Sequence, residues 1–289
     1  MKIAIVYLSY VPYGPIFLEN FLKSYISNKP NINHSLHIVM NGWKDDEEHK
    51  LQLLLFDEIL KQYEVEHLKH YSLENYDIGV YLSMEEEIES DFFVFLNTRS
   101  KIINRYWLDY LFANITKPGV GAVGATGAWG DATLKKRMFK LLKKLIRFKV
   151  KFSEFKQLIF YYTNLYPTLR PHLRTNAFMI KSEILRKLIY HKISPCFIRP
   201  FAGTKQERLQ TLCFEHGRQN MNFQIESMRL RTLVVGADGK GYEQSEWYDS
   251  NTFWSGNQEN LIVTDNQTEK YATARDSVRK FLRFSAWYK

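Results

Sequence analysis

Residues 92–96, Phe-Phe-Val-Phe-Leu, form an uninterrupted apolar run that ends in the polar triplet Asn97-Thr98-Arg99. A short run of this kind predicts a strand buried on both faces, as in a parallel sheet that is covered by helices. In open α/β sheets, ligands bind just beyond the carboxyl ends of the strands. The triplet is therefore expected to lie at a ligand site.

Strand-like and helix-like segments alternate before this run. We expect further strands at residues 2–8, 35–40 and 64–70, and helices at 15–27, 45–62 and 76–89. Pro15 suits a first helical turn, and the acidic start at residues 45–48 suits the helix dipole. This βαβ alternation predicts an α/β fold with a mostly parallel sheet flanked by helices.

The regular alternation of strand-like and helix-like segments ends after residue 100. The pattern predicts helices at 107–114, 182–190 and 207–227, and strands at 120–125, 175–180 and 231–235. Residues 236–270 show little periodicity but contain many aromatic residues, which argues for an ordered loop region rather than disorder. We expect a catalytic domain at 1–240 with a basic helical insertion at 134–165, and a C-terminal extension at 241–289 packed on the same domain.

Composition sets the class of protein. The 289 residues are 45% hydrophobic and 25% charged, which is typical of a soluble globular protein. Cys196 and Cys213 show no metal-type spacing and fit a reducing compartment. The opening segment runs straight into a strand-like pattern without the apolar core of a signal peptide, and no stretch approaches the ~18 apolar residues of a membrane span. We therefore expect a cytoplasmic protein.

Four places in the chain resemble the nucleotide-sugar-dependent glycosyltransferases of the GT-A fold, in particular the family-2 group. They are the opening strand IAIVYLSY at 3–10, IVMNG at 38–42, NYDIG at 75–79 followed by FVFLNTR at 93–99, and FEHGR at 214–218. The resemblance covers residues 1–240. It implies transfer of a sugar from a nucleotide-sugar donor to a glycan or lipid-linked glycan, with inversion, in surface polysaccharide synthesis.

The chain departs from this family at one important point. Relatives carry an Asp-x-Asp triplet, which holds Mg²⁺ or Mn²⁺ against the donor diphosphate, where this chain has Asn97-Thr98-Arg99. Hard cations prefer carboxylate oxygens, whereas Asn97 offers one neutral oxygen and Arg99 would repel a cation. Our hypothesis is that the Arg99 guanidinium takes over part of the metal's role, the alternative being a surface ion pair.

The resemblance also suggests site residues. Glu215 matches the late acidic position and is the candidate base for the acceptor hydroxyl, with His216 as a second candidate. Its alternative role is an ion pair with Arg218 at i+3 spacing. The candidate donor-binding residues are Ser9, Tyr10, Asn41, Asp77, Asn97, Arg174 and Asn176.

Two further roles are open. Asp77 is expected either to read an edge of the nucleotide base or to cap the helix that follows it. Trp247, Trp254 and Gln258 are expected either to close over the site as an acceptor lid or to pack the C-terminal region.

The net charge of +9 is matched by the nine Lys and Arg residues at 135–151, a segment without acids. Within 134–152 one helical face collects the apolar side chains of Met138, Leu141, Leu142, Leu145, Phe148 and Phe152. Such a basic amphipathic helix is typical of a membrane-surface element, here at the anionic inner face of the cell membrane. The alternative is a solvated helix that packs its apolar face on the protein.

The sequence bears on three other function classes. Nucleic-acid binding fits the pI of 9.3, but the charge is confined to one segment and no nucleic-acid-binding motif is present, so we expect none. Sugar-nucleotide nucleotidyltransferases carry a Gly-rich basic loop after the first strand, whereas this chain has Pro12-Tyr13-Gly14-Pro15. A catalytically inactive glycan-binding relative stays an alternative, because the acidic triplet is missing.

Overall fold

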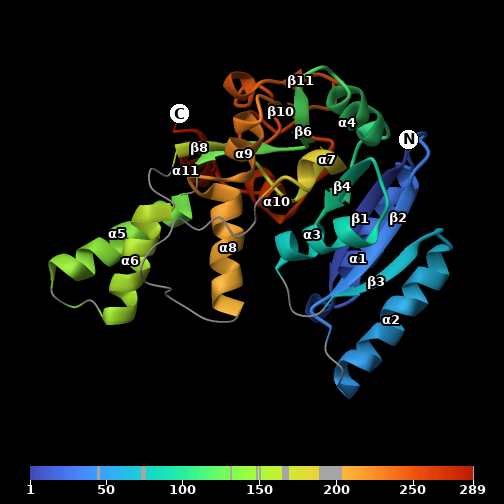
Figure 1. Cartoon of the computed structure of the whole chain (residues 1–289), viewed down its shortest axis with the longest axis horizontal. Coiled ribbons are helices and arrows are strands. Elements are labelled where there is room, and N and C mark those ends of the chain that lie inside the picture. Colours follow the sequence, from blue (N-terminus) through green and yellow to red (C-terminus); the bar gives the residue numbers. More distant parts are fainter. Residues whose placement is uncertain are drawn as a thin grey trace.

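The apolar run at residues 92–96 is strand β4 (Phe92–Leu96), which lies inside an eight-stranded sheet in the computed structural model (Figure 1). Phe93 and Phe95 pack into the core on one face of the sheet, and Val94 and Leu96 pack into the core on the other face. The run is apolar throughout because both of its faces are covered. The structure describes residues 1–43, 46–72, 76–130, 132–147, 149, 151–164, 169–188 and 204–288.

The central sheet is mainly parallel, which confirms the expected α/β fold class. Its strands in spatial order are β11 (Gly241–Tyr242), β10 (Arg231–Val235), β6 (Val120–Gly124), β9 (Ala177–Lys181), β4, β1 (Ile3–Tyr10), β2 (Ser35–Asn41) and β3 (Leu68–Ser72). The antiparallel strands are β9, between β4 and β6, and β11 at the edge. Two small antiparallel sheets pair β12 (Val263–Thr264) with β5 (Lys101–Ile102), and β7 (Gly127–Gly130) with β8 (Leu169–Leu173).

Helices cover both faces of the sheet (Figure 1). One face buries apolar side chains of α1 (Ile16–Ser27), α2 (Glu47–Tyr63) and α4 (Trp107–Ile115). The other face buries side chains of α3 (Asp77–Glu87), α7 (Ser182–Leu185), α8 (Thr204–His216), α9 (Met221–Ser227) and α11 (Asp276–Trp287). The alternating pattern of the first hundred residues thus produces the expected layers.

Three predicted helices are wrong in their extent. The helix predicted at 182–190 is the short α7, which ends at Leu185, and residues 186–188 are not helical. The segment 207–227 is divided into α8 and α9. The Gly217 amide closes the last turn of α8 on the Cys213 carbonyl at 2.8 Å, and Asn220 starts α9 as its cap by accepting from the Phe223 amide. The basic segment forms α5 (Ala132–Ile146), and a second helix, α6 (Phe152–Asn164), follows it. Glu154 helps to start α6, since its carboxylate accepts from the Lys151 amide at 3.1 Å.

Helices α5 and α6 pack against each other as a hairpin that stands away from the central sheet (Figure 1). Lys144 of α5 forms an ion pair with Glu154 of α6. Leu141 is buried, which agrees with packing of part of the apolar face, whereas Phe139, Leu142 and Ile146 are exposed. Phe148 and the side chains of Met138 and Phe152 lie outside the described residues, as do Asn75, Cys196 and the end of the helix predicted at 182–190.

The C-terminal part of the chain, from residue 236 onward, contains more regular structure than we predicted from the sequence. Besides β11 and β12 it holds the short helix α10 (Asn266–Ala272) and α11. Trp247 is 0% exposed, and a Cβ added to Gly127 would meet its ring at 2.6 Å. The segment after residue 240 therefore fills part of the same core as the strands; the domain boundary at 240 stays a prediction.

Candidate functional site

A cavity of about 670 Å³ lies at the carboxyl ends of β1, β2 and β4. Five of the residues proposed from the sequence line it, namely Tyr10, Asn41, Asp77, Asn97 and Arg99. They come from four separate segments of the chain, which the sheet brings to one edge. The other lining residues are Leu8, Tyr13, Tyr76, Thr98, Arg208 and Asn266.

The polar triplet after β4 forms a tight turn that is fixed from several sides. The Asn97 side-chain oxygen accepts from the Arg99 amide and from the Ser100 hydroxyl, both at 3.1 Å. The Thr98 hydroxyl accepts from the Tyr10 amide at 3.1 Å. Such local side-chain-to-backbone bonds are typical of an Asx turn. The turn is thus a rigid base for the residue that follows it.

Arg99 lies against two aromatic rings. Its guanidinium carbon is 4.9 Å from the centre of the Tyr13 ring and 4.6 Å from that of Phe17. Cation–π contacts of this kind hold a guanidinium in place at little cost in hydration. Because Arg99 also lines the cavity, its charge is held next to any ligand there.

Arg208 on α8 is a second cation at the cavity, and the sequence analysis missed it. The sequence did contain a pattern that could have predicted it. Arg208 and Glu215 are seven residues apart, which is two helical turns, so a helix that brings one to a site brings the other to the same face.

The candidate bases Glu215 and His216 are not among the residues that line the cavity, but Glu215 is a neighbour of Asp77, which does. The Glu215 carboxylate accepts a hydrogen bond from the Thr175 hydroxyl, and its second oxygen is 3.8 Å from His216 Nε2. Asp77, which lines the cavity, is close enough to Glu215 that the two charges repel. Burial, with the Glu215 charge adding to it, raises the pKa of Asp77 to about 7.

Asp77 is the first residue of α3 and not its cap, because the cap position is taken by Tyr76. Its carboxylate accepts from the Ile78 amide at 3.0 Å. The expectation that Asp77 caps α3 is therefore wrong, although its carboxylate bonds an amide of the first turn, and that carboxylate borders the cavity.

Three of the proposed donor-binding residues do not line the cavity. Ser9 is buried within β1. Arg174 forms a buried ion pair with Asp265, with Nη2 and Oδ2 2.6 Å apart. Asn176 accepts from the Thr126 hydroxyl at 3.0 Å, and its backbone oxygen accepts from the Asn97 amide, so it supports the turn from behind.

The proposed lid residues pack the C-terminal region. Trp247 does not reach the cavity, since it lies in the core and donates to the Tyr242 carbonyl at 3.0 Å. Trp254 donates to the Gln267 carbonyl and Gln258 to the Thr268 carbonyl, both at 2.9 Å. The last two side chains join their loop to α10; a closing motion of this loop stays a prediction.

The triplet does not fit a divalent cation. It supplies no carboxylate, the Asn97 oxygen already accepts two hydrogen bonds, and Arg99 brings a positive charge. Within the described residues there is also no group of three His, Cys, Asp or Glu side chains arranged to hold a metal.

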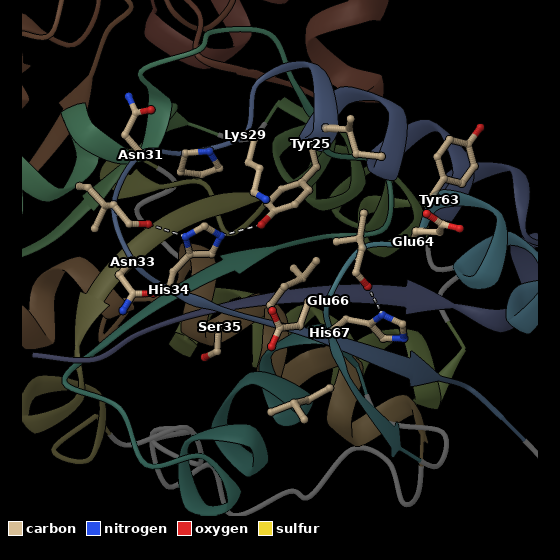
Figure 2. Close-up of a pocket in the computed structure, with 16 residues that line it drawn as sticks. Tyr25, Lys29, Asn31, Asn33, His34, Ser35, Tyr63, Glu64, Glu66 and His67 are labelled. Atoms are coloured by element: carbon tan, nitrogen blue, oxygen red, sulfur yellow. Dashed lines mark hydrogen bonds between the residues drawn. The ribbon is translucent and has the colours of Figure 1, made fainter.

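A larger cavity, of about 970 Å³, lies at the amino ends of β2 and β3, away from the edge where α/β sheets bind ligands (Figure 2). Its histidines are occupied in holding their own loops. The His34 ring bonds both the Tyr25 hydroxyl and the Ile32 carbonyl, each at 2.6 Å, and the His67 ring bonds the Val65 carbonyl at 2.7 Å. We therefore place the candidate site at the smaller cavity.

Comparison with solved structures finds nucleotide-sugar enzymes. A mannosyltransferase from Pyrobaculum calidifontis, in complex with GDP-Man and Mn²⁺, is 12% identical, with 86% of this chain and 59% of that chain covered and a TM-score of 0.45. Glucosyl-3-phosphoglycerate synthase from Mycobacterium tuberculosis is 10% identical, with 65% and 59% covered and a TM-score of 0.40. A CMP:2-keto-3-deoxy-manno-octonic acid synthetase complexed with CTP is 10% identical, with 74% and 85% covered and a TM-score of 0.39.

These similarities concern the fold, and the chain spans about 59% of the length of the first two structures. No family model and no curated protein matches this sequence. None of the helices in the described ranges is long and apolar enough to cross a membrane.

Proposed function

We propose that this protein is a glycosyltransferase, and specifically a hexosyltransferase, that binds a nucleotide-sugar donor in the cavity at the carboxyl ends of β1, β2 and β4. One observation carries the proposal: two guanidinium groups, Arg99 and Arg208, border the same cavity as Asp77, and Asp77 is the neighbour of Glu215. Glycosyl transfer needs positive charge for a leaving diphosphate, which the two guanidinium groups supply at this cavity. It also needs a carboxylate to accept a proton, and Glu215 is the neighbour of the cavity-lining Asp77.

The parts of the cavity suit the parts of such a donor. The planar guanidinium groups of Arg99 and Arg208 can each give two aligned hydrogen bonds to phosphate oxygens. Tyr10, Tyr13 and Tyr76 provide aromatic surface for a base or a sugar ring. Arg99 needs little reorganisation because two rings already hold it. In this proposal it neutralises the diphosphate where relatives use a metal ion.

In this proposal Glu215 acts on the acceptor. Its carboxylate would take the proton of a sugar hydroxyl as that oxygen attacks the anomeric carbon from the side opposite the diphosphate, which gives inversion. We propose a glycan or lipid-linked glycan acceptor in surface polysaccharide synthesis. Both the inversion and the acceptor rest on the family resemblance of residues 1–240.

A thermal-shift screen with UDP-, GDP-, CMP- and dTDP-sugars tests donor binding, since a ligand at 100 times its Kd stabilises a protein by about 2.7 kcal/mol. We expect one class of donor to raise the Tm in excess EDTA as well as in Mn²⁺. Arg99→Lys should lose most of that shift, because Lys cannot give two aligned bonds, while the exposed Arg105→Lys should keep it. Donor binding that disappears in EDTA and returns with Mn²⁺ would refute the role of Arg99.

We also propose that the α5–α6 hairpin binds an anionic membrane surface. Phe139 is 58% and Ile146 is 75% exposed, and with Leu142 they form an apolar stripe at helical spacing. Beside the stripe, a groove of about 480 Å³ is lined by Phe139, Lys140, Lys143, Lys144, Arg147 and Lys149. Each basic residue near anionic lipid adds on the order of 1 kcal/mol, and the apolar stripe can enter the headgroup layer. The protein would then be peripheral at the inner face of the cell membrane.

Flotation with vesicles of phosphatidylcholine and phosphatidylglycerol tests the membrane proposal. We expect Lys140→Glu/Lys143→Glu to abolish flotation, and the equally charged control Lys61→Glu/Lys187→Glu, on exposed sites outside the hairpin, to retain it. Equal flotation of the two double variants would show that only net charge matters and would refute a hairpin-specific contact.

A further inference from the structure

Among the described residues that line the cavity, Asn266 alone comes from the part of the chain beyond residue 240. It is the first residue of α10, and its side chain is exposed. Within the described part of the chain this side chain makes no hydrogen bond. The amide group of Asn266 is therefore available to a molecule that occupies the cavity.

The residue before it, Asp265, is buried and fixed on two sides. One carboxylate oxygen accepts from the Gln267 and Thr268 amides at 3.0 and 2.9 Å, and the other accepts from Arg174 Nη2 at 2.6 Å. Because Asp265 already bonds these amides and carries a negative charge, this end of α10 offers no place for an anion. What α10 brings to the cavity is the neutral side chain of Asn266.

A buried chain of hydrogen bonds joins Arg174 to the turn that follows β4. Arg174 Nη1 donates to the Thr126 hydroxyl at 3.4 Å. That hydroxyl donates to the Asn176 side-chain oxygen at 3.0 Å, and the Asn176 carbonyl accepts from the Asn97 amide at 3.0 Å. Thr126 is 0% exposed and Asn176 is 3% exposed. The start of α10 is thus held at a fixed position relative to the Asn97 turn.

Two side chains that we expected to cover the site hold α10 from the other side. Trp254 donates to the Gln267 carbonyl and Gln258 to the Thr268 carbonyl, both at 2.9 Å. Since Gln267 and Thr268 directly follow Asn266, these bonds restrain the same end of the helix. The loop therefore affects the cavity through the residue that α10 carries there.

The order of the strands places Asn266 and the nucleotide-binding candidates on opposite sides of Arg99. Along the sheet the order is β2, β1, β4 and β9. Asn41 ends β2 and Tyr10 ends β1, whereas Arg99 follows β4. Strand β9 is antiparallel to β4, so Arg174, which precedes β9 and holds the start of α10, lies at the same edge. An extended donor with its diphosphate at Arg99 and its nucleoside toward β1 and β2 has its sugar on the β9 side.

We propose that the Asn266 side-chain amide bonds hydroxyl groups of the donor's sugar and contributes to the choice of sugar. This inference rests on the proposed function, and it adds a contact from outside the residues 1–240 that the family resemblance covers. An uncharged amide offers one acceptor and two donors, so it can both accept from and donate to neighbouring hydroxyls. A diphosphate only accepts, and Arg99 and Arg208 already border the cavity for that role.

The test compares each nucleotide sugar with its nucleoside diphosphate alone. The Kd values of UDP-glucose, UDP-galactose, GDP-mannose and dTDP-rhamnose, and of UDP, GDP and dTDP, are measured by calorimetry. For the nucleotide sugar that wild type binds, we expect Asn266→Ala to raise the Kd roughly three- to tenfold, as loss of one or two hydrogen bonds does. The Kd of the matching nucleoside diphosphate should change by less than about twofold.

Asn257→Ala is the matched control, because Asn257 is an exposed asparagine of the same region that does not line the cavity. It should leave both Kd values unchanged. Thr126→Val keeps the buried shape and removes the hydroxyl between Arg174 and Asn176. If this chain positions Asn266, Thr126→Val should also weaken binding of the nucleotide sugar and spare the nucleoside diphosphate.

Deoxy analogues of the sugar identify the contact. The analogue that lacks the bonded hydroxyl should bind wild type and Asn266→Ala with the same Kd, because the interaction is absent from both complexes. A site that bonds a hydroxyl discriminates against an analogue without it, so the same analogue should bind wild type more weakly than the complete donor does.

The outcomes separate this inference from the proposed function. If wild type and Asn266→Ala have the same ratio of the two Kd values, the contact with the sugar is refuted and the proposed function stands. If Asn266→Ala weakens the nucleoside diphosphate as much as the nucleotide sugar, Asn266 bonds the nucleotide part, which also overturns the inference. Absence of binding of every nucleotide sugar to wild type would refute the proposed function and this inference together.

Discussion

The ion pair between Arg174 and Asp265 gives the sharpest prediction for stability. Asp265 caps α10 through one carboxylate oxygen, which accepts from the Gln267 and Thr268 amides at 3.0 and 2.9 Å, and its other oxygen bonds Arg174. The Asp265 side chain is 1% exposed and the Arg174 side chain is 16% exposed. Asp265→Asn keeps an oxygen for the cap and removes only the charge, so it isolates the ion pair.

Removing one partner of a buried pair leaves the other charge uncompensated and typically costs about 3–5 kcal/mol. We expect Asp265→Asn and Arg174→Met each to lower the free energy of unfolding by that order at pH 7, measured by urea denaturation. The double variant should lose clearly less than the sum of the two, because neither charge is then left alone. As a control, Glu269→Gln breaks the exposed pair with Lys101 and should cost less than about 1 kcal/mol.

The pH dependence of the same pair has a defined sign. Burial alone would raise the pKa of Asp265, but Arg174 and the capping amides lower it below its usual range. Its contribution is therefore present above the unfolded pKa, near 3.8, and is lost as the pH falls below that value. For the urea experiment on the ion pair itself, additive losses in the double variant, or a cost of Asp265→Asn under about 1 kcal/mol, would refute the stabilising role of the pair.

The remaining predictions concern one turn and one strand. Gly42→Ala should cost about 1–2 kcal/mol for its positive φ and also weaken donor-induced stabilisation, because a Cβ there would meet the Tyr10 ring at 2.5 Å. Gly14→Ala, with a similar φ but open space around it, should show only the first effect. Burial, with the neighbouring His70 adding to it, lowers the pKa of His37 to about 4, so wild type should lose stability as the pH falls from 6.5 toward 4 and His37→Gln should lose less, as measured by Tm. An equal loss in the two proteins would contradict the neutral state of His37.

The position of the cavity at the carboxyl ends of the strands could be predicted, because it depends on residues that are adjacent in the sequence. Polar residues that follow an apolar strand must lie at its carboxyl end, and Tyr10, Asn41, Asn97 and Arg99 all do so. The direction of β9 could not be predicted, because a buried strand has the same apolar pattern whichever way it runs.

Roles that depend on distant partners were harder to predict. Arg174 has the charge of a phosphate-binding residue, but Asp265, ninety-one positions later, binds it instead. Trp247 has the side chain expected of a lid, but Gly127 leaves room for its ring in the core. No local pattern around these residues reports such contacts. Arg208 is a different case, since its spacing from Glu215 would have been sufficient.

The hydrogen bonds from the Asn97 amide and the Ser100 hydroxyl to the Asn176 carbonyl have a consequence for biosynthesis. They join residues nearly eighty positions apart, and β9 must insert between β4 and β6 before they can form. Pairing of such distant segments is slow, because the intervening chain must first close into a loop. A ribosome-bound chain that has emerged only as far as β6 therefore has the three strands whose carboxyl ends border the cavity, but no support behind the turn that follows β4. The cavity should thus be completed late in folding, after most of the polypeptide has been made.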